Sequence, residues 1–333
     1  MAKKKKRITV QEKFDAFLER LSEMLGPSLF RDVKNTFVER PTTFRINVLK
    51  AGRSSSVQVF KNELLADLQR KGFKVKRVEW YRDAFILLNK SKRDLQKLDM
   101  YMEGEIYLQS LASMVPVVVL GALPGESVLD LTAAPGSKTS QIAADMMYKG
   151  ELVANDMSSI RFEKLEHNLN KLGVMDENDG WKVKLHNEPG QILAREYDGY
   201  FDKILLDAPC TAEARFCESK PNTYAFWRKS NIKEMAFVQR KLLFAAWAAL
   251  KPGGVLVYST CTFAPEENEM QISRFLERTS DAEILDVGLE GVNRLPVLKK
   301  WNEVALHSGV KKCFRIKPSN EIEGFFVAKL EKH

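Results

Sequence analysis

The sequence is organised around Val128-Leu129-Asp130-Leu131-Thr132-Ala133-Ala134-Pro135-Gly136-Ser137-Lys138-Thr139, where an apolar run of strand length meets a turn of small residues. Residues 141–147, which follow, have helical composition. The pattern therefore predicts a strand, a tight turn and a helix. Small side chains let a ligand approach the backbone, and the first turn of a helix offers unpaired N–H groups to the polar end of that ligand. We expect this turn to bind a nucleotide.

Two known nucleotide-binding patterns do not match this turn. A P-loop needs glycine at both ends of its spacer before Lys-Ser/Thr, but Thr132 and Ser137 occupy those two positions. A dinucleotide site needs Gly-x-Gly-x-x-Gly, which is also absent. An adenosine ligand that is not a dinucleotide fits the turn best.

An acidic residue stands where such a ligand would need one. Residues 151–155 are expected to form the next strand, and Asp156 follows them, 20 residues after Gly136. At about that distance a carboxylate of a Rossmann-type fold meets the ribose hydroxyls. Asp156 could instead cap a helix that begins near Ser158, so both roles are open for it at this point.

Length and charge limit the class of protein. A chain of 333 residues exceeds what one hydrophobic core usually serves, so two domains are expected. With 44% hydrophobic and 29% charged residues, the composition is that of a soluble globular protein. The 52 basic residues against 44 acidic ones give a net charge of +8, which favours a polyanionic partner.

Several other classes are disfavoured. The longest apolar run, around residues 114–123, is too short to span a bilayer, and the N-terminus lacks the apolar core of a secretion signal. The basic run over residues 3–7 predicts a disordered tail at 1–8, and such a run could also serve as a nuclear address. Zinc is not expected, because no Cys-x-x-Cys pair occurs and the histidines show no ligand spacing. The four cysteines are expected to be reduced thiols.

The first hundred residues predict a small α+β unit, which we place at residues 9–101. A basic, strand-rich surface of this unit would bind phosphates without reading sequence, although a purely solvating role is an equal alternative for each single side chain. Its members are Lys71, Lys74, Lys76, Arg77, Lys90, Lys92 and Arg93. The expected elements are a helix over 10–25 ended by Gly26-Pro27, a strand over 44–49, a helix over 61–71, and strands over 73–80 and 85–88.

Residues 102–333 predict the larger domain. A buried helix over 109–120 leads into the strand at Val128, and strands then alternate with helices. Such alternation predicts right-handed crossovers and a parallel sheet covered on both faces. Residues 313–317 and 324–330 predict a hairpin that adds one antiparallel strand at or near an edge. The other expected elements are strands over 151–155, 182–186, 201–207 and 254–259 and helices over 159–172, 231–250 and 266–279.

Two cysteines follow the ends of two predicted strands. Asp207-Ala208-Pro209-Cys210 closes the strand over 201–207, and Thr260-Cys261 closes the strand over 254–259. In open α/β sheets the chemistry lies outside the carboxyl ends of the strands. If these strands are neighbours, Asp207, Cys210 and Cys261 lie around one pocket beside the turn. One cysteine at a strand end is usually a small buried hydrophobe, but two at corresponding ends favour chemistry, and the reduced state disfavours a disulfide.

Four motifs, in this order, carry a family resemblance. They are Asp130-Leu131-Thr132-Ala133-Ala134-Pro135-Gly136-Ser137-Lys138-Thr139, Asp207-Ala208-Pro209-Cys210, Ser259-Thr260-Cys261-Thr262 with Pro265-Glu266-Glu267-Asn268, and Glu323-Gly324-Phe325-Phe326. From about Arg40 to its C-terminus the chain resembles the Nop/Sun (Fmu-type) family of S-adenosylmethionine-dependent RNA 5-methylcytosine methyltransferases. Thr132 stands where the family often has Cys, and Thr211-Ala212 where it often has Ser-Gly, and neither change removes a reacting group.

The resemblance implies a fold and a cofactor site. The fold would be α/β, a Rossmann-like class I methyltransferase with a mostly parallel sheet and an antiparallel C-terminal strand, joined to a small N-terminal α+β RNA-binding domain. The cofactor would be S-adenosylmethionine, with Asp156 at its ribose hydroxyls, Glu188 at its adenine and Asp207 beside it. The residues expected to hold its methionine end and ribose are Thr132, Ala133, Ala134, Pro135, Gly136, Ser137 and Lys138.

The resemblance also implies the chemistry. Carbon 5 of cytosine takes a methyl group only after a thiolate has added to carbon 6. By resemblance Cys261 is that nucleophile, Cys210 assists release of the adduct, and Asp207 binds the N3/N4 edge of the base. An ordinary thiol is little ionised at neutral pH, so we expect Lys138 and the sulfonium charge of the cofactor to stabilise the thiolate.

Two rival functions are open at this point. One is an RNA N-methyltransferase on the same fold, which would need no cysteine, and the other is a non-catalytic RNA-binding or assembly factor. The expected partner is rRNA or tRNA, without a metal and without a membrane. We expect a monomer in the cytoplasm, or in the nucleus or nucleolus of a eukaryote.

Overall fold

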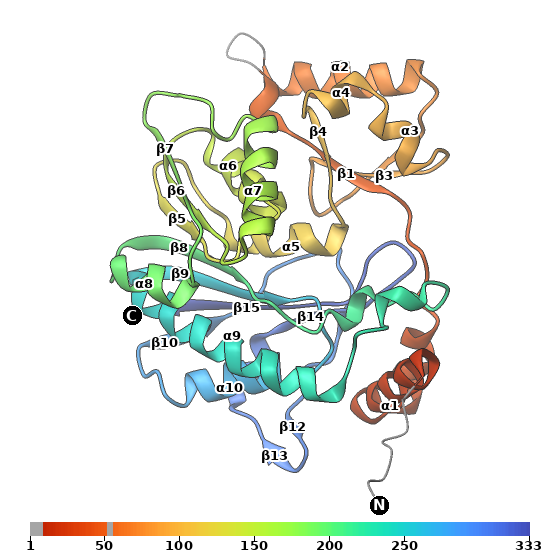
Figure 1. The fold of residues 1–333 in the computed structure, drawn as a ribbon, viewed down its shortest axis with the longest axis vertical. Coiled ribbons are helices and arrows are strands. Elements are labelled where there is room, and N and C mark those ends of the chain that lie inside the picture. Colours follow the sequence, from red (N-terminus) through yellow and green to blue (C-terminus); the bar gives the residue numbers. More distant parts are fainter. Residues whose placement is uncertain (1–8, 52–55) are drawn as a thin grey trace, which may run out of the picture.

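Two large sheets organise the chain, one in each of two regions (Figure 1). The computed structural model describes residues 9–51 and 56–333, so the predicted tail at 1–8 lies outside the described residues. A four-stranded sheet belongs to the small upper unit of Figure 1, and a nine-stranded sheet crosses the large region below it.

The small unit folds around an antiparallel sheet of order β2-β3-β1-β4. Phe44 and Phe85 face each other across β1 and β3, with ring centroids 5.5 Å apart, and helix α2 covers them with Leu64 and Leu68. The predicted strand over 44–49 is shorter, because Val48–Ala51 turns into a 3₁₀ helix, and β4 lies beyond residue 101. The elements are β1 (Thr43–Ile46), α2 (Val57–Arg70), β2 (Val75–Arg77), β3 (Ala84–Leu87), α3 (Lys92–Gln96), α4 (Asp99–Met102) and β4 (Ile106–Leu108).

The large sheet has the order β11-β14-β15-β9-β8-β5-β6-β7. Strands β5 to β9 run parallel, and β15 runs antiparallel to β9, which confirms the mostly parallel α/β sheet with an antiparallel C-terminal strand. Strand β15 is not the edge, because β14 and β11 extend the sheet beyond it. The strands are β5 (Ser127–Asp130), β6 (Gly150–Asn155), β7 (Trp181–His186), β8 (Phe201–Asp207), β9 (Leu250–Thr260), β10 (Ala282–Leu285), β11 (Arg294–Leu295), β14 (Phe314–Ile316) and β15 (Phe325–Lys332).

Helices cover both faces of this sheet, as Figure 1 shows. One buried cluster lies under α5, α6 and α7, and a second lies under α8, α9 and α10. Helix α10 begins three residues later than predicted, because residues 265–268 form a turn that is held by the side chain of Asn268. The helices are α5 (Leu111–Leu120), α6 (Ser137–Met146), α7 (Ser159–Lys171), α8 (Gly190–Glu196), α9 (Lys229–Ala249) and α10 (Glu269–Leu276).

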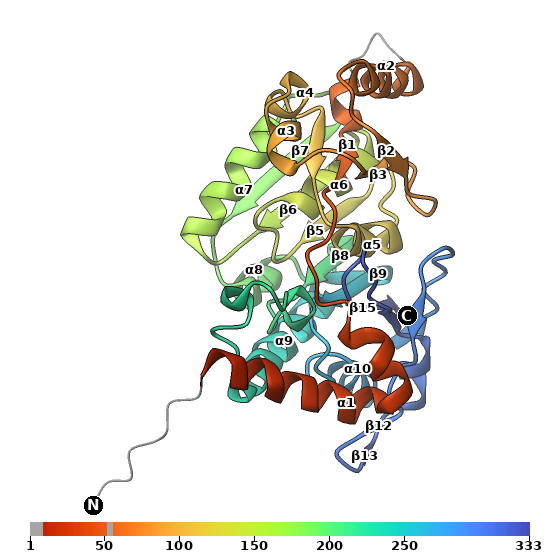
Figure 2. The same ribbon diagram turned by 90° about the vertical axis from the view of Figure 1, so that its right-hand side faces the viewer.

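The first helix docks on the large region rather than on the small unit (Figure 2). Helix α1 (Val10–Lys34) breaks at Gly26, where φ is 72° and ψ is 167°, and then resumes, so the predicted end at Gly26-Pro27 is a kink. Its Phe14 stacks on Tyr224 at 4.7 Å, and its Phe17 meets Phe216 edge-on at 4.9 Å.

A buried arginine joins the small unit to the helix that follows the turn of small residues. Arg45 on β1 is fully buried, and its guanidinium donates to Gln109 Oε1 at 3.0 Å and to Ser140 Oγ at 2.5 Å. Asn47 adds hydrogen bonds to the carbonyl oxygens of Gly104 and Leu172, at 2.9 and 2.8 Å. The small unit and helices α6 and α7 are therefore held as one body.

We expect Arg45→Ala to destabilise the chain by about 2–4 kcal/mol, because it leaves the buried acceptors of Gln109 and Ser140 without their charged donor. Urea unfolding measures this change. The matched control is Arg70→Ala on the exposed face of α2, which should leave the unfolding midpoint in place. Equal midpoints for the two variants would contradict the role given to Arg45.

Candidate active site

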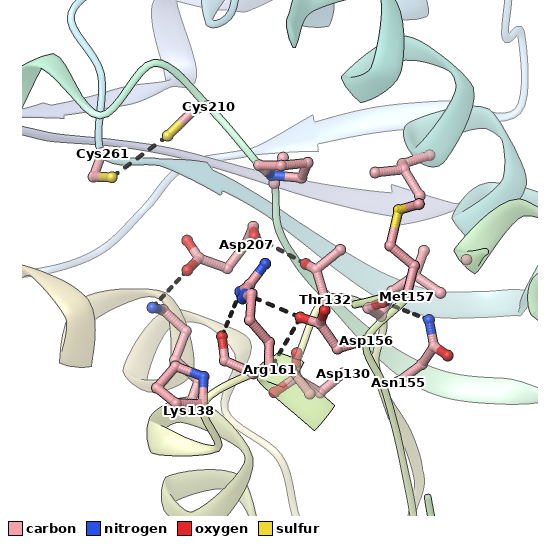
Figure 3. A pocket seen from close by; sticks show the side chains of 18 of the residues that line it. Asp130, Thr132, Lys138, Asn155, Asp156, Met157, Arg161, Asp207, Cys210 and Cys261 are labelled. Carbon is pink, nitrogen blue, oxygen red and sulfur yellow. Dashed lines mark hydrogen bonds and ion pairs between the residues drawn. The ribbon is translucent and has the colours of Figure 1, made fainter. Parts of the chain in front are cut away.

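A cavity of about 430 Å³ opens at the carboxyl ends of β5, β6, β8 and β9 (Figure 3). It brings together most of the residues that the sequence predicted for the site. Those that line it are Thr132, Ala133, Ala134, Pro135, Ser137, Lys138, Asp156, Asp207, Cys210 and Cys261. Gly136 and Glu188 are the two that do not line it.

Gly136 shapes the turn from outside the cavity. It precedes α6 with φ of 97°, a left-handed conformation that favours glycine. A Cβ atom at this position would lie 3.1 Å from Leu165 Cδ1 and 3.3 Å from Leu169 Cδ2, both on α7. Glycine therefore allows α7 to pack against the turn.

Helix α7 also fixes the carbonyl groups of the turn. Arg161 Nη2 donates to Ala134 O at 2.6 Å, and Asn168 Nδ2 donates to Pro135 O at 2.7 Å. Arg161 lines the cavity and pairs with Asp156 Oδ2 at 3.2 Å, as Figure 3 shows. Arg161 was not among the predicted site residues, because nothing in a helical segment marks the one side chain that turns back to a loop.

Asp156 contacts both the residue before α7 and the turn of small residues, and its role at a ribose stays a prediction. Its Oδ1 accepts from the N–H of Ser158 at 3.0 Å, just before α7, and its Oδ2 accepts from the N–H of Ala134 at 3.3 Å. The same carboxylate lies in the cavity wall beside the turn. These two hydrogen bonds fix the carboxylate of Asp156 at the cavity.

A second buried carboxylate, Asp130 at the end of β5, was not among the predicted site residues. Its Oδ2 accepts from Thr139 Oγ1 at 2.7 Å, whereas its Oδ1 is buried without a hydrogen-bond partner among the described residues. Burial raises the pKa of Asp130 to about 7, against the opposing hydrogen bond from Thr139 and the charge of Lys138. An unsatisfied acceptor in a cavity wall is a place for a ligand's donor.

An ion pair lies on the floor of the cavity. Lys138 Nζ is 2.6 Å from Asp207 Oδ2, and it also donates to Ser113 Oγ at 2.8 Å. Asp207 Oδ1 accepts from Ser259 Oγ at 2.8 Å on the neighbouring strand. Asp207 is therefore held from both sides, with a side chain that remains 24% exposed toward the cavity.

The two cysteines meet because β8 and β9 are parallel neighbours, with Asp207 opposite Ser259. Cys210 Sγ and Cys261 Sγ lie 3.4 Å apart, and both thiols are free (Figure 3). A hydrogen bond from Cys210 lowers the pKa of Cys261, and the charges of Arg215 and Lys138 act in the same direction against burial. The same contact, together with burial, raises the pKa of Cys210. Cys261 is thus the better nucleophile of the pair.

Arg215 is the larger of these two cationic contributions, and the sequence analysis did not find it. It ends the short 3₁₀ turn η2 (Glu213–Arg215) and lines the cavity next to the cysteines. The expected contribution of Lys138 to the thiolate is present. No local pattern around Arg215 signals its approach to Cys261, because that approach depends on the path of the loop after β8.

The segment after Cys261 holds both cysteine loops. Asn268 accepts from Thr260 Oγ1 at 2.5 Å and donates to Thr262 O at 2.9 Å, on the two sides of Cys261. Glu267 Oε2 accepts from the N–H of Thr211, next to Cys210, at 3.0 Å. The motif Pro265-Glu266-Glu267-Asn268 is therefore a positioning device for the two sulfurs.

The closing motif Glu323-Gly324-Phe325-Phe326 supports the same loops. A Cβ atom at Gly324 would lie 2.4 Å from Phe263 Cζ, so only glycine fits against that ring. The next residue, Phe325, places its ring centroid 5.7 Å from Lys138 Nζ.

The structure does not place Glu188 in the cavity. Its backbone is held by the Asn155 side chain at 3.0 and 3.2 Å, and its carboxylate lies 3.4 Å from His186 Nδ1. The role of Glu188 stays a prediction, and side chains from the residue after Asp156, from α8 and from α9 also line the cavity without having been predicted. These are Met157, Gln191, Val238 and Leu242.

The part of the chain that the structure describes holds neither a cluster of metal ligands nor a membrane-spanning helix. Within 9–51 and 56–333, no three His, Cys, Asp or Glu side chains come together in a way that could hold a metal ion. Over the same ranges, no helix has both the length and the apolar character that crossing a bilayer requires.

Comparison with known proteins identifies the family. Residues 117–331 match the model of the family described as 16S rRNA methyltransferase RsmB/F. The chain belongs to this family. The resemblance to the Nop/Sun RNA 5-methylcytosine methyltransferases is thereby confirmed.

Two curated relatives of this RsmB/F-family chain match most of its length. The ribosomal RNA small subunit methyltransferase F of Vibrio parahaemolyticus is 34% identical over 327 residues, which cover 96% of this chain and 63% of that protein. The chain thus spans less than two thirds of that relative. The tRNA (cytosine(49)-C(5))-methyltransferase of Pyrococcus abyssi is 35% identical over 297 residues and 88% of each chain.

Solved structures confirm the expected fold. A methyltransferase homolog protein from Pyrococcus horikoshii superimposes with a TM-score of 0.79 at 33% identity, over 96% of this chain and 95% of that one. NSun6 from Pyrococcus horikoshii, solved with SFG, superimposes with a TM-score of 0.75 at 24% identity, over 95% of this chain and 97% of that one.

We expect Cys261 to be the first thiol of the chain to react with iodoacetamide as the pH rises. Both Cys210→Ala and Arg215→Ala should shift its alkylation to higher pH, because each removes a group that stabilises the thiolate. Alkylation followed by peptide mass spectrometry over a pH series measures this shift. The matched control is Lys220→Ala, an exposed cation paired with Glu39, and a shift in that variant as large as in Arg215→Ala would refute the assignment.

Proposed function

We propose that this RsmB/F-family chain transfers a methyl group from S-adenosylmethionine to carbon 5 of a cytosine in RNA, through a covalent bond to Cys261. The observation that carries the proposal is the pair of sulfurs 3.4 Å apart in the wall of the same cavity as Asp156 and Asp207. The substrate class is rRNA or tRNA, because the two relatives described above are named for one and the other. A cytoplasmic, monomeric protein stays a prediction.

The cavity fits the cofactor at three points. The unsatisfied Oδ1 of Asp130 would accept from its ammonium group, and the fixed carboxylate of Asp156 would accept from its ribose hydroxyls. The apolar side chains of Met157, Val238 and Leu242 line the part of the wall available to its adenine. When bound, S-adenosylmethionine supplies an electrophilic methyl group.

The chain's own residues would activate the cytosine. The Cys261 thiolate would add its Sγ to carbon 6, so that carbon 5 becomes nucleophilic. Carbon 5 would then bond to the methyl group as the methyl–sulfur bond of the donor breaks, with the electron pair left on that sulfur. Asp207, oriented by Lys138 and Ser259, would accept hydrogen bonds from the N3/N4 edge and stabilise the ring while N3 carries a proton. A base then removes the proton from carbon 5. The double bond between carbon 5 and carbon 6 re-forms as the bond between Sγ and carbon 6 breaks. Cys210, next to that sulfur, would assist this release.

Neither rival function requires two thiols beside the carboxylates of the same cavity. An N-methyltransferase needs no thiol beside the base, and a non-catalytic binding factor needs neither the lowered pKa of Cys261 nor the unsatisfied acceptor of Asp130. The geometry therefore favours methyl transfer to carbon 5.

Alanine at the two cysteines should give different outcomes. Cys261→Ala should abolish transfer of labelled methyl groups to total RNA, because no thiolate remains to add to carbon 6. Cys210→Ala should accumulate a protein–RNA adduct that survives a denaturing gel and disappears with ribonuclease. Cys313→Ala, the same change at a fully buried core cysteine, should still transfer methyl groups without an adduct. Identical behaviour of Cys210→Ala and Cys261→Ala would reverse or remove the assignment.

Binding of S-adenosylmethionine should depend on Asp130 and on pH. Because the pKa of Asp130 is about 7 in the free protein and an ammonium needs the ionised form, affinity should rise as the pH passes upward through 7. Asp130→Asn should weaken binding by about 10- to 100-fold at pH 8 and flatten this pH profile. Titration calorimetry measures both, with the exposed Asp198→Asn as control. An unchanged profile in Asp130→Asn would show that another group titrates.

A further inference from the structure

A second large hollow lies on the small unit and is strongly basic. It lies between residues 39–42 and residues 87–98 and has a volume of about 1270 Å³. We call it the basic groove. Its charged lining residues are Arg40, Lys71, Lys90, Lys92, Arg93 and Lys97 on the positive side and Glu39 and Asp94 on the negative side.

Two of the cations in the basic groove have no hydrogen-bond or ion-pair partner among the described residues. Lys92 and Arg93 lie in the first turn of α3, are exposed, and make no side-chain hydrogen bond or ion pair within the described part of the chain. By contrast, Lys71 pairs with Asp67 and Lys97 lies 3.8 Å from Asp94. An exposed, uncompensated cation is available for a phosphate group.

The basic groove adjoins the active site through a smaller hollow. It shares Glu39, Arg40 and Pro41 with a smaller hollow of about 250 Å³, and that hollow shares Arg215 with the cavity that holds Cys261. The lining of this smaller hollow is of mixed charge. Lys220 pairs with Glu39, and the carboxylates of Glu321 and Glu323 lie on the same lining. The three hollows therefore adjoin in one order, with Arg215 at the last boundary before the reactive sulfur.

We infer that the basic groove holds the sugar–phosphate backbone of an unpaired RNA segment next to the target cytosine, and that Arg215 contacts this backbone where the base turns into the cavity. The inference rests on the proposed function and extends it to the path of the substrate. A base must leave its stack to reach Cys261, and this costs least in a single strand.

The groove should hold phosphates rather than read bases. Its one aromatic ring, that of Phe73, is buried at 6% exposure and covered by Lys90 Nζ, 4.3 Å from the ring centroid, so no ring is free to stack on a base. Binding here should therefore depend strongly on salt and weakly on sequence.

The test removes two charges from the groove and two from elsewhere. The variant Lys92→Gln/Arg93→Gln is compared with Lys299→Gln/Lys311→Gln, exposed cations of a different hollow on the large region. The full chain is titrated with a labelled single-stranded oligoribonucleotide of mixed sequence over a salt series. Each lost phosphate contact should reduce the slope of log affinity against log salt by about 0.7, and thus by about 1.4 for the groove variant. The control variant should keep the wild-type slope.

Methyl transfer separates failure of this path from failure of the proposed function. If the wild type transfers no labelled methyl group to total RNA, the proposed function is wrong. If it does, the groove variant should show a raised KM for RNA with an unchanged KM for S-adenosylmethionine. Equal losses in both double variants, or tighter binding of a duplex than of the single strand, would overturn the inference. Binding of polyglutamate as tight as that of RNA would assign the groove to an acidic protein segment instead.

Discussion

The site depends on the parallel pairing of β5, β8 and β9, whose carboxyl ends lie side by side. The register sets Asp130 opposite Leu205 and Asp207 opposite Ser259, so a carboxylate from each of two strands reaches the same edge as the thiols that follow them. These strands are buried on both faces and cannot slip by one residue without turning core side chains outward. The sheet therefore fixes the reacting groups more firmly than the loops alone could.

Burial gives each charged group in the cavity a different task. Lys138 and Asp207 form an ion pair at 2.6 Å, which orients the carboxylate of Asp207. The contact between the two sulfurs acts in opposite directions on their pKa values. The pKa of Cys261 is lowered, also by nearby cations, while the pKa of Cys210 is raised. A nucleophile and a protonated neighbour thus arise from two residues of the same type, which differ only in what surrounds them.

The sequence predicted what local patterns encode. The turn after β5, the alternation of strands and helices, and the two cysteine loops follow from periodicity and spacing, and the structure contains them. Contacts that depend on the path of a loop or the direction of one side chain were not predictable, and these include Arg215 beside Cys261 and Arg161 on Ala134. The sequence predicted the helix over 10–25 but not what it packs against, which is the large region.

The two regions of the chain use basic residues in opposite ways. Arg45 is buried where the small unit meets the large region. Its guanidinium donates hydrogen bonds to protein acceptors and so holds the small unit against α6. Lys92 and Arg93, exposed on the same unit, have no such acceptors among the described residues, so their charge remains available to a ligand in the groove. Because the buried hydrogen bonds of Arg45 join the small unit to α6, a polyanion bound by the exposed cations would lie at a defined place relative to Cys261. The basic surface can serve the reaction only at a defined distance from the reacting sulfur. It therefore depends on the buried Arg45 as well as on the exposed Lys92 and Arg93.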